Sequence, residues 1–207
     1  MRGSIAVIIG LLFASCASFL VSRSGYVWDV GTEKQMAILP FEVLMANKIF
    51  PEGEKVESLE AFEESQSYYM QRDMFRYFLR EMFKNGFDTS FVQDVNDSNI
   101  RLQEANIDYA NMGAFSYDSL ARILQVDALL AGRIVELPKS GIVTGFLNRK
   151  SDLQFRIHGQ FYLLDGSDGR LLWRFDEKLN GRGESTPYSL SKDIMRRVAS
   201  NFPFRDR

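Results

Sequence analysis

The chain has almost none of the side chains that nucleophilic and metal-dependent active sites use most. Its 207 residues include one cysteine, Cys16, and one histidine, His158. A lone thiol excludes an intramolecular disulfide, and two such ligands are too few for a usual zinc site. A Ser–His or Cys–His pair would have to use His158, which lies on the polar side of an alternating segment. We therefore predict no catalytic residue, no metal ligand and no cofactor site.

A basic excess and a phosphate-binding glycine loop are missing too. Lysine and arginine total 25 against 27 aspartate and glutamate, so the net charge is −2 and nothing indicates nucleic-acid binding. The glycines at 166–170 lie between two strand-like segments, whereas phosphate loops join a strand to a helix. Asp165 and Asp168 are typical turn formers, a reading that we prefer to a glycosidase carboxylate pair. The chain is thus expected not to be an enzyme.

The most apolar part of the sequence is its beginning. A basic start is followed by an apolar run over residues 5–13, two small residues and then Cys16. Basic, apolar and small-residue regions in this order are typical of a secretory signal peptide. Because cysteine comes next, the site resembles the lipobox of bacterial lipoproteins, with Phe13 where leucine is usual. We predict a signal peptide over residues 1–15 and lipid attachment at Cys16.

Two alternatives to a lipoprotein stay open. Residues 5–21 are 17 residues without a charge, close to the lower limit for a membrane-spanning helix, so an uncleaved signal anchor is one alternative. Ordinary signal cleavage near Ala17 is the other. All three place the chain from Gly25 onward outside the cytoplasm. For a lipoprotein, alanine rather than aspartate after the cysteine favours the outer membrane, with the domain in the periplasm.

The part beyond the anchor predicts one domain on a tether. Residues 22–34 are polar and contain two glycines, so we expect residues 16–34 to hold the lipidated cysteine and a tether. Residues 26–28, which include a tryptophan, could still pack onto the domain. Residues 35–207 are enough for one hydrophobic core and too few for two ordinary domains.

Hydrophobic periodicity predicts the elements of this domain. Strands are expected over residues 35–45, 89–94, 127–137, 151–165 and 170–179, and helices over 58–85, 97–105, 116–125 and 188–200. Pro40 should lie at an end or a kink of the first strand. The predicted inward stripe of the long helix is Phe75, Phe78, Leu79, Met82 and Phe83, and that of the last strand is Leu171, Trp173 and Phe175. The order predicts a mixed α/β fold: a central sheet with a C-terminal hairpin and helices packed on it.

Five segments together carry a family resemblance. They are MAILPFEVL (36–44), KNGFDTSFVQD (84–94), the run from 102 to 137 that ends in LARILQVDALLAGRIVEL, FYLLDGSDGRLLW (161–173) and ASNFPF (199–204). In this order they resemble the envelope lipoproteins that include the curli-secretion channel subunit and the activators of penicillin-binding proteins. The resemblance implies an anticodon-binding-like α/β domain without catalysis. It also implies that the chain scaffolds, activates or assembles with other envelope proteins.

Two functions therefore compete. The first is a lipid-anchored, non-catalytic periplasmic module that binds other envelope proteins through its sheet edges or the loop at 139–150. The second is a subunit of an oligomeric outer-membrane secretion assembly. Residues 139–150 are 12 residues with two glycines, too short for two spanning strands of ~9–11 residues each, which disfavours a pore. An enzyme of unknown type is the third hypothesis, and no residue supports it.

Overall fold

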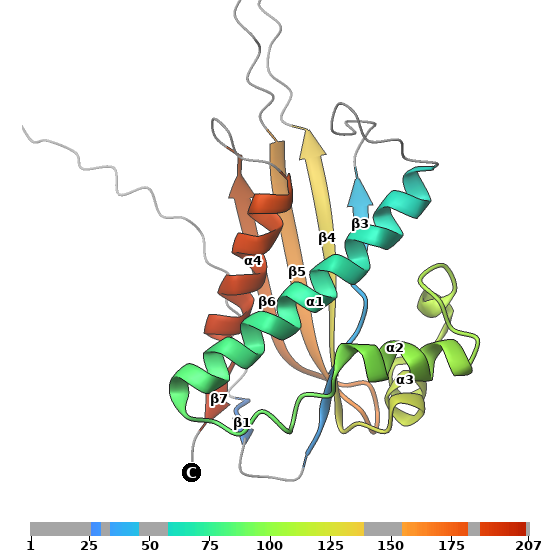
Figure 1. The fold of residues 1–207 in the computed structure, drawn as a ribbon, viewed down its shortest axis with the longest axis vertical. Coiled ribbons are helices and arrows are strands. Elements are labelled where there is room, and N and C mark those ends of the chain that lie inside the picture. Colours follow the sequence, from blue (N-terminus) through green and yellow to red (C-terminus); the bar gives the residue numbers. More distant parts are fainter. Residues whose placement is uncertain (1–25, 30–33, 46–57, 139–154, 182–186, 206–207) are drawn as a thin grey trace, which may run out of the picture.

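Five strands form one mixed sheet (Figure 1), and the computed structural model describes residues 26–29, 34–45, 58–138, 155–181 and 187–205 around it. β4 (Ala128–Pro138) pairs in parallel with β2 (Met36–Ile38) and β3 (Glu42–Met45) on one side. On its other side it pairs antiparallel with β5 (Phe155–Asp165), and β6 (Leu171–Asn180) follows β5. This arrangement confirms the predicted mixed α/β fold.

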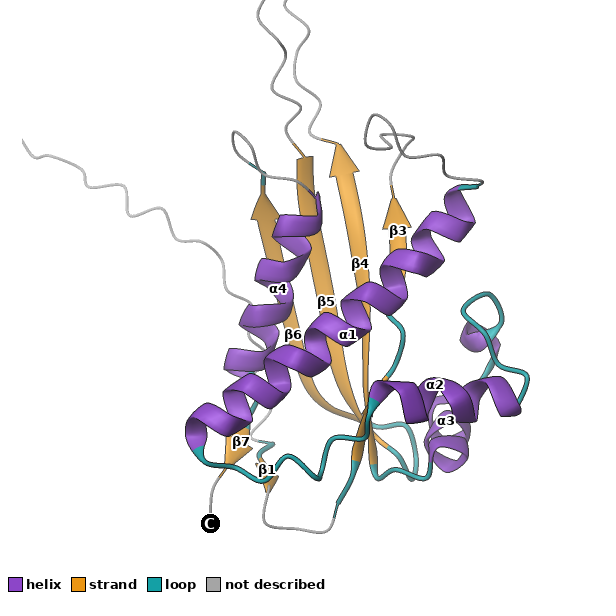
Figure 2. Cartoon of the chain, viewed as in Figure 1, coloured by secondary structure: helices purple, strands orange, loops and turns teal. Residues whose placement is uncertain are grey.

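The helices cover the two faces of the sheet unequally (Figures 1 and 2). On what we call the inner face lie α1 (Leu59–Asn85) and α4 (Pro187–Asn201), which pack against each other and against the largest apolar cluster. On the opposite, outer face, α2 (Val95–Glu104) and α3 (Tyr117–Leu124) pack where β2 and β4 begin, with the 3-10 turn Met112–Ala114 between them. The rest of the outer face carries no described helix.

Pro40 divides the first predicted strand. β2 and β3 follow the same edge of β4 on either side of residues 39–41, so the expected kink is confirmed and the single strand becomes two. A proline has no N–H for a ladder, and it is tolerated in an edge segment of a sheet at such an interruption. Phe41, fully buried at the break, packs edge-on against Phe161 with ring centroids 5.3 Å apart.

The long helix has the predicted length but a rotated buried face. Ser58 accepts a hydrogen bond from the Ala61 amide at 3.0 Å, and Gly86 ends the helix in the left-handed region at φ 73°. The buried positions are Ser67, Met70, Gln71, Met74, Phe78 and Met82. Placing Phe83 in the inward stripe was wrong, because it is 85% exposed. Apolar residues occupy a wider arc of α1 than the arc that is buried, so periodicity alone does not show which positions lie at the centre of the buried face.

The predicted strand over residues 89–94 is a single parallel bridge between Val92 and Met36. Gln93 then donates its amide to the Met36 carbonyl at 2.9 Å, and the chain turns into α2. This helix starts two residues before the predicted residue 97, since Asp94 caps it by accepting from the Asn96 amide at 2.7 Å. Because α2 begins at Val95, too few residues follow Val92 for the segment to continue as a strand.

The predicted hairpin of β5 and β6 is confirmed, with one correction at its turn. Leu163 pairs with Trp173 and Leu164 with Leu171, so the register shifts by one and Leu172 is the extra residue. This bulge reverses the alternation. Leu172 is buried and Leu171 is 49% exposed, opposite to the expected facing of Leu171.

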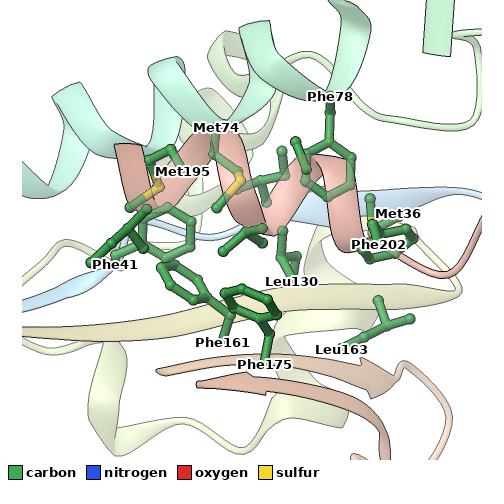
Figure 3. Packing of buried hydrophobic residues seen from close by; sticks show 14 of the residues in the cluster. Met36, Phe41, Met74, Phe78, Leu130, Phe161, Leu163, Phe175, Met195 and Phe202 are labelled. Carbon is green, nitrogen blue, oxygen red and sulfur yellow. The ribbon is translucent and has the colours of Figure 1, made fainter. Parts of the chain in front are cut away.

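Phe161 is the centre of the inner core (Figure 3). Gly132 on β4 and Gly159 on β5 make room for its ring. A Cβ at Gly132 would lie 2.6 Å from Phe161 Cδ1, and one at Gly159 would lie 2.8 Å from Phe161 Cε2. Both strands thus give up a side chain so that one aromatic ring can lie flat on the sheet beneath α4.

The first described residues close the fold against the last. β1 (Trp28–Asp29) pairs in parallel with β7 (Phe204–Arg205), and the Trp28 amide donates to the Pro203 carbonyl at 2.8 Å. Trp28 is 2% exposed, with its ring centroid 5.8 Å from that of Phe91. The packing of residues 26–28 that the sequence left open is thus found at Trp28.

Candidate interaction surface

The proposed lipid-attachment residue, Cys16, lies outside the described residues, as does the loop at 139–150. Of the other sequence candidates, Asp165 and Asp168 are turn formers as predicted. Asp165 accepts the Ser167 amide at 2.9 Å and Asp168 accepts the Arg170 amide at 2.9 Å. These contacts hold the hairpin turn, and each carboxylate bonds to a backbone amide two residues further along the chain.

The open part of the outer face is polar. Alternation along the strands directs one set of side chains away from the inner core: Arg133, His158, Gln160, Tyr162, Arg174, Asp176 and Lys178. Arg133 also forms an ion pair with Glu42 of β3 at 3.2 Å. We call these residues the outer-face cluster.

Asp176 organises the cluster. Gln160 donates to one carboxylate oxygen at 2.9 Å, and Arg174 donates to both oxygens, at 2.5 and 3.1 Å. Burial alone would raise the pKa of Asp176, but the hydrogen bonds from Arg174 and Gln160 bring it below its usual value. The guanidinium of Arg174 lies 5.6 Å from the centre of the Tyr162 ring. The cluster is therefore an ordered patch rather than a set of independent charges.

His158 lies at the edge of this network, on the polar face as predicted. Its side chain is 23% exposed, and Nε2 lies 3.6 Å from Asp176 Oδ1, beyond hydrogen-bond length. Burial, helped by the nearby Lys178 cation, lowers the pKa of His158 despite the opposing effect of Asp176. Among the described residues no hydroxyl hydrogen-bonds to this imidazole, so the arrangement offers no nucleophile for it to activate.

The β3 edge of the sheet is closed by side chains. The Val43 amide donates to the Tyr109 hydroxyl at 3.0 Å, and that hydroxyl donates to the Val43 carbonyl at 3.2 Å. Two residues on, the Met45 amide donates to Glu63 Oε1 of α1 at 2.8 Å. The amide and carbonyl of Val43 and the amide of Met45, which could otherwise bond to an added strand, are therefore occupied. Neither capping residue was singled out from the sequence, because both contacts join distant segments.

The β6 edge differs. In the described part of the chain, β5 is the only strand that pairs with β6. From Trp173 to Asn180 one edge of β6 pairs with β5. The other edge, beside the outer-face cluster, pairs with no described strand. An open edge of this length can accept an added strand.

The described residues contain neither a metal-binding cluster nor a bilayer-spanning helix. No group of three histidine, cysteine or acidic side chains comes together there in a way that could hold a metal ion. None of the described helices combines the length and the apolar character that crossing a bilayer requires.

Comparison with known proteins gives similarities of fold. No family model matches the chain, and no curated protein matches its sequence. The lipoprotein GNA1162 from Neisseria meningitidis is 12% identical, with a TM-score of 0.49 over 81% of this chain and 96% of that one. The PelC dodecamer from Paraburkholderia phytofirmans is 16% identical, with a TM-score of 0.48 over 86% of this chain and 92% of that one. The LpoB C-terminal domain from Salmonella enterica is 11% identical, with a TM-score of 0.35 over 70% of this chain and 82% of that one.

Proposed function

We propose that this protein is a lipid-anchored module of the bacterial cell envelope that binds other envelope proteins and is not an enzyme. One observation carries the proposal: the only thiol of the chain, Cys16, directly follows an apolar run and two small residues. Lipidation consumes that thiol, and acyl chains contribute about 0.8 kcal/mol per buried CH₂. The outer membrane, with the domain in the periplasm, is the location that this anchor favours.

The fold suits binding better than chemistry. The outer-face cluster joins a fixed carboxylate, a guanidinium and an aromatic ring beside the open β6 edge. Arginine and aromatic side chains are enriched at protein interfaces, and an open edge adds backbone hydrogen bonds. A partner would thus dock along β6 while the anchor holds the module at the membrane.

The edges also bear on the alternative, a subunit of an oligomeric secretion assembly. A ring built by strand pairing needs two different open edges, one on each side of every subunit. Here Tyr109 and Glu63 occupy backbone groups of β3, so among the described strands the edge left for strand addition is that of β6. Pairing through one edge gives a two-fold dimer or a complex with a different protein. This argues against a ring closed by the sheet.

The anchor is tested by the intact mass of protein extracted from membranes. We expect a mass that begins at Cys16 and carries acyl chains, and a Cys16→Ala variant that is neither cleaved there nor acylated. Ser24→Ala is a matched control for a small change in the same segment. An unacylated chain of full mass, retained in the membrane in both the parent and the Cys16→Ala variant, would instead identify an uncleaved anchor.

The binding surface is tested with a photo-crosslinking residue at Lys178, compared with one at Arg122 of α3, which is 73% exposed. We expect defined adducts with another envelope protein at Lys178 in intact cells, lost when Arg174→Glu breaks the cluster. Adducts of equal pattern at both positions would contradict the assignment. A homogeneous ring of many subunits by mass photometry in detergent would favour the alternative function.

A further inference from the structure

The exposed side of α1 is uniform in charge along its second half. Between residues 66 and 84 the exposed positions of this helix are Tyr69, Arg72, Arg76, Arg80, Phe83 and Lys84. They follow one another at steps of three and four, with Phe83 and Lys84 adjacent, so they form one stripe. We call them the α1 stripe. It consists of four cations and two aromatic rings, without an exposed acid.

The acids of this half of the helix lie beside the stripe and are mostly covered. Asp73 and Glu81 are 13% and 17% exposed, and they pair with Arg76 at 3.5 Å and Lys84 at 3.6 Å. Arg72 stacks instead on Tyr69, 4.9 Å from its ring centre. Within the described residues no carboxylate lies within 4 Å of Arg72 or Arg80. The stripe therefore keeps a net positive charge on a chain whose total is −2.

Phe83 is the most exposed large apolar side chain of the described residues, at 85%. Tyr69, at the other end of the stripe, is 50% exposed. Phe83 follows Tyr69 by fourteen residues, over which the helix rises about 21 Å. The apolar face of α1 is buried in the core, so the contact that this exposed face offers a lipid surface is the attraction of its cations to anionic headgroups, with one aromatic side chain at each end.

The stripe lies close to where the N-terminal segment joins the domain. The C-terminal end of α1 meets β1 and β7 at one end of the molecule (Figure 1). There the ring of Phe87 lies 5.9 Å from that of Phe204, and β1 pairs with β7. From Cys16 to Tyr26 there are ten residues, which span at most about 35 Å. If the apolar segment is held in a bilayer, Phe83 is within reach of the same bilayer.

We propose that the α1 stripe binds the anionic phospholipid surface of the membrane that holds the N-terminus. An anionic leaflet attracts each nearby arginine or lysine, and it accepts a convex helix without a matching recess. With the stripe on the lipid, the sheet lies behind α1 and the outer-face cluster faces away from the membrane.

The test uses the full chain, purified in detergent and reconstituted into vesicles of phosphatidylcholine or of phosphatidylcholine mixed equally with phosphatidylglycerol. A benzophenone amino acid replaces Phe83 in one sample and Tyr117 of α3, 42% exposed, in the matched control. We expect lipid adducts at position 83, several-fold stronger in the anionic vesicles and stronger than at 117. Equal yields at both positions, or adducts of position 83 with a protein instead of lipid in native membranes, would overturn the proposal.

Charge reversal separates electrostatic binding from mere proximity. Arg76→Glu with Arg80→Glu should lower the adduct yield at position 83 by roughly fivefold for each cation removed. Arg122→Glu on α3 should leave it unchanged, and added salt should reproduce the loss. An unchanged yield in the double variant would refute the stripe.

The inference rests in part on the proposed anchor, and flotation of the vesicles tells the two apart. A chain that floats with both lipids but gives no adduct at 83 keeps the anchor and loses the stripe. A chain that floats only with the anionic vesicles, and only while Arg76 and Arg80 are intact, keeps the stripe and loses the anchor. A chain that floats with neither loses both.

Discussion

The hydroxyl oxygen of Tyr109 lies 3.0 Å from the amide nitrogen of Val43 and 3.2 Å from its carbonyl oxygen, across 66 residues of sequence. One side chain thereby satisfies both backbone groups that Val43 turns away from β4. The loop after α2 covers this edge of the sheet, so within the described part of the chain β6 is the edge that remains for pairing with another chain.

Removing this hydroxyl tests the cover. Tyr109→Phe keeps the ring but leaves the amide and carbonyl of Val43 without their partner, which should lower the free energy of unfolding by about 1–3 kcal/mol. Urea unfolding measures the change. Tyr117→Phe is the control, because its hydroxyl has no hydrogen bond within the described residues. The newly open edge should also make the variant self-associate with concentration. Equal stability of both variants would show that the cover is not needed.

Gly132 provides a test of the inner core. Gly132→Ala would put a methyl group 2.6 Å from Phe161 Cδ1 and 3.0 Å from Phe41 Cδ1, so we expect a loss of about 1–3 kcal/mol in unfolding free energy. Gly113→Ala, where the new Cβ meets nothing within 4 Å, is the control. Adding Phe161→Leu to Gly132→Ala should recover part of the loss, because the crowded ring is gone. Additive losses in the double variant would mean that the two residues do not compete for space.

The elements that the sequence predicts well are those with a strong local signal. Ser58 and Gly86 bound α1 as expected, and the alternation over β5 and β6 defines the hairpin. The errors occur where a distant contact overrides the local pattern. The bulge at Leu172 inverts the facing of Leu171, and no residue type in the turn signals that extra residue. Phe83 is apolar, yet it follows the buried Met82 about 100° round the helix and so faces away from the core.

For the two candidate surfaces as well, the sequence predicts the local features and not the contacts between distant residues. Alternation places His158 and Asp176 on the polar side of the sheet before any coordinates are known. The hydrogen bonds from Gln160 and Arg174 that order this side depend on strand register, which a single sequence does not fix. The α1 stripe is visible in the sequence as four cations at steps of four. Their isolation from exposed acids becomes evident only once the buried face of α1 is known.

His158 reports on the outer-face cluster, because a single histidine gives one set of imidazole signals in an NMR titration. Its pKa is lowered by burial first and by Lys178 next, against the opposing effect of Asp176. Lys178→Met should therefore raise the pKa of His158, and Asp176→Asn should lower it further. Arg122→Met on α3 controls for loss of a distant cation. Shifts of the opposite sign would mean that His158 does not face these two groups.

Glu136 predicts a pH dependence of stability. It lies on the inner side of β4 between Met45 and Ile157, and burial raises the pKa of its carboxyl from 4.5 to about 7. In the unfolded chain the carboxyl ionises at the lower value. The folded state therefore holds its proton more tightly, and this contribution is fully present below pH 4.5 and lost as the pH rises through 7.

Glu136→Gln removes this effect because a glutamine stays neutral. The stability of the variant relative to the parent should increase between pH 4.5 and 7 and then level off, by about 3 kcal/mol at most. Urea unfolding across this range measures the difference, in which the titration of all other groups cancels. Glu104→Gln, an exposed position of α2, controls for the loss of one negative charge. A difference that stays constant with pH would show that Glu136 ionises in the folded protein as it does in the unfolded chain.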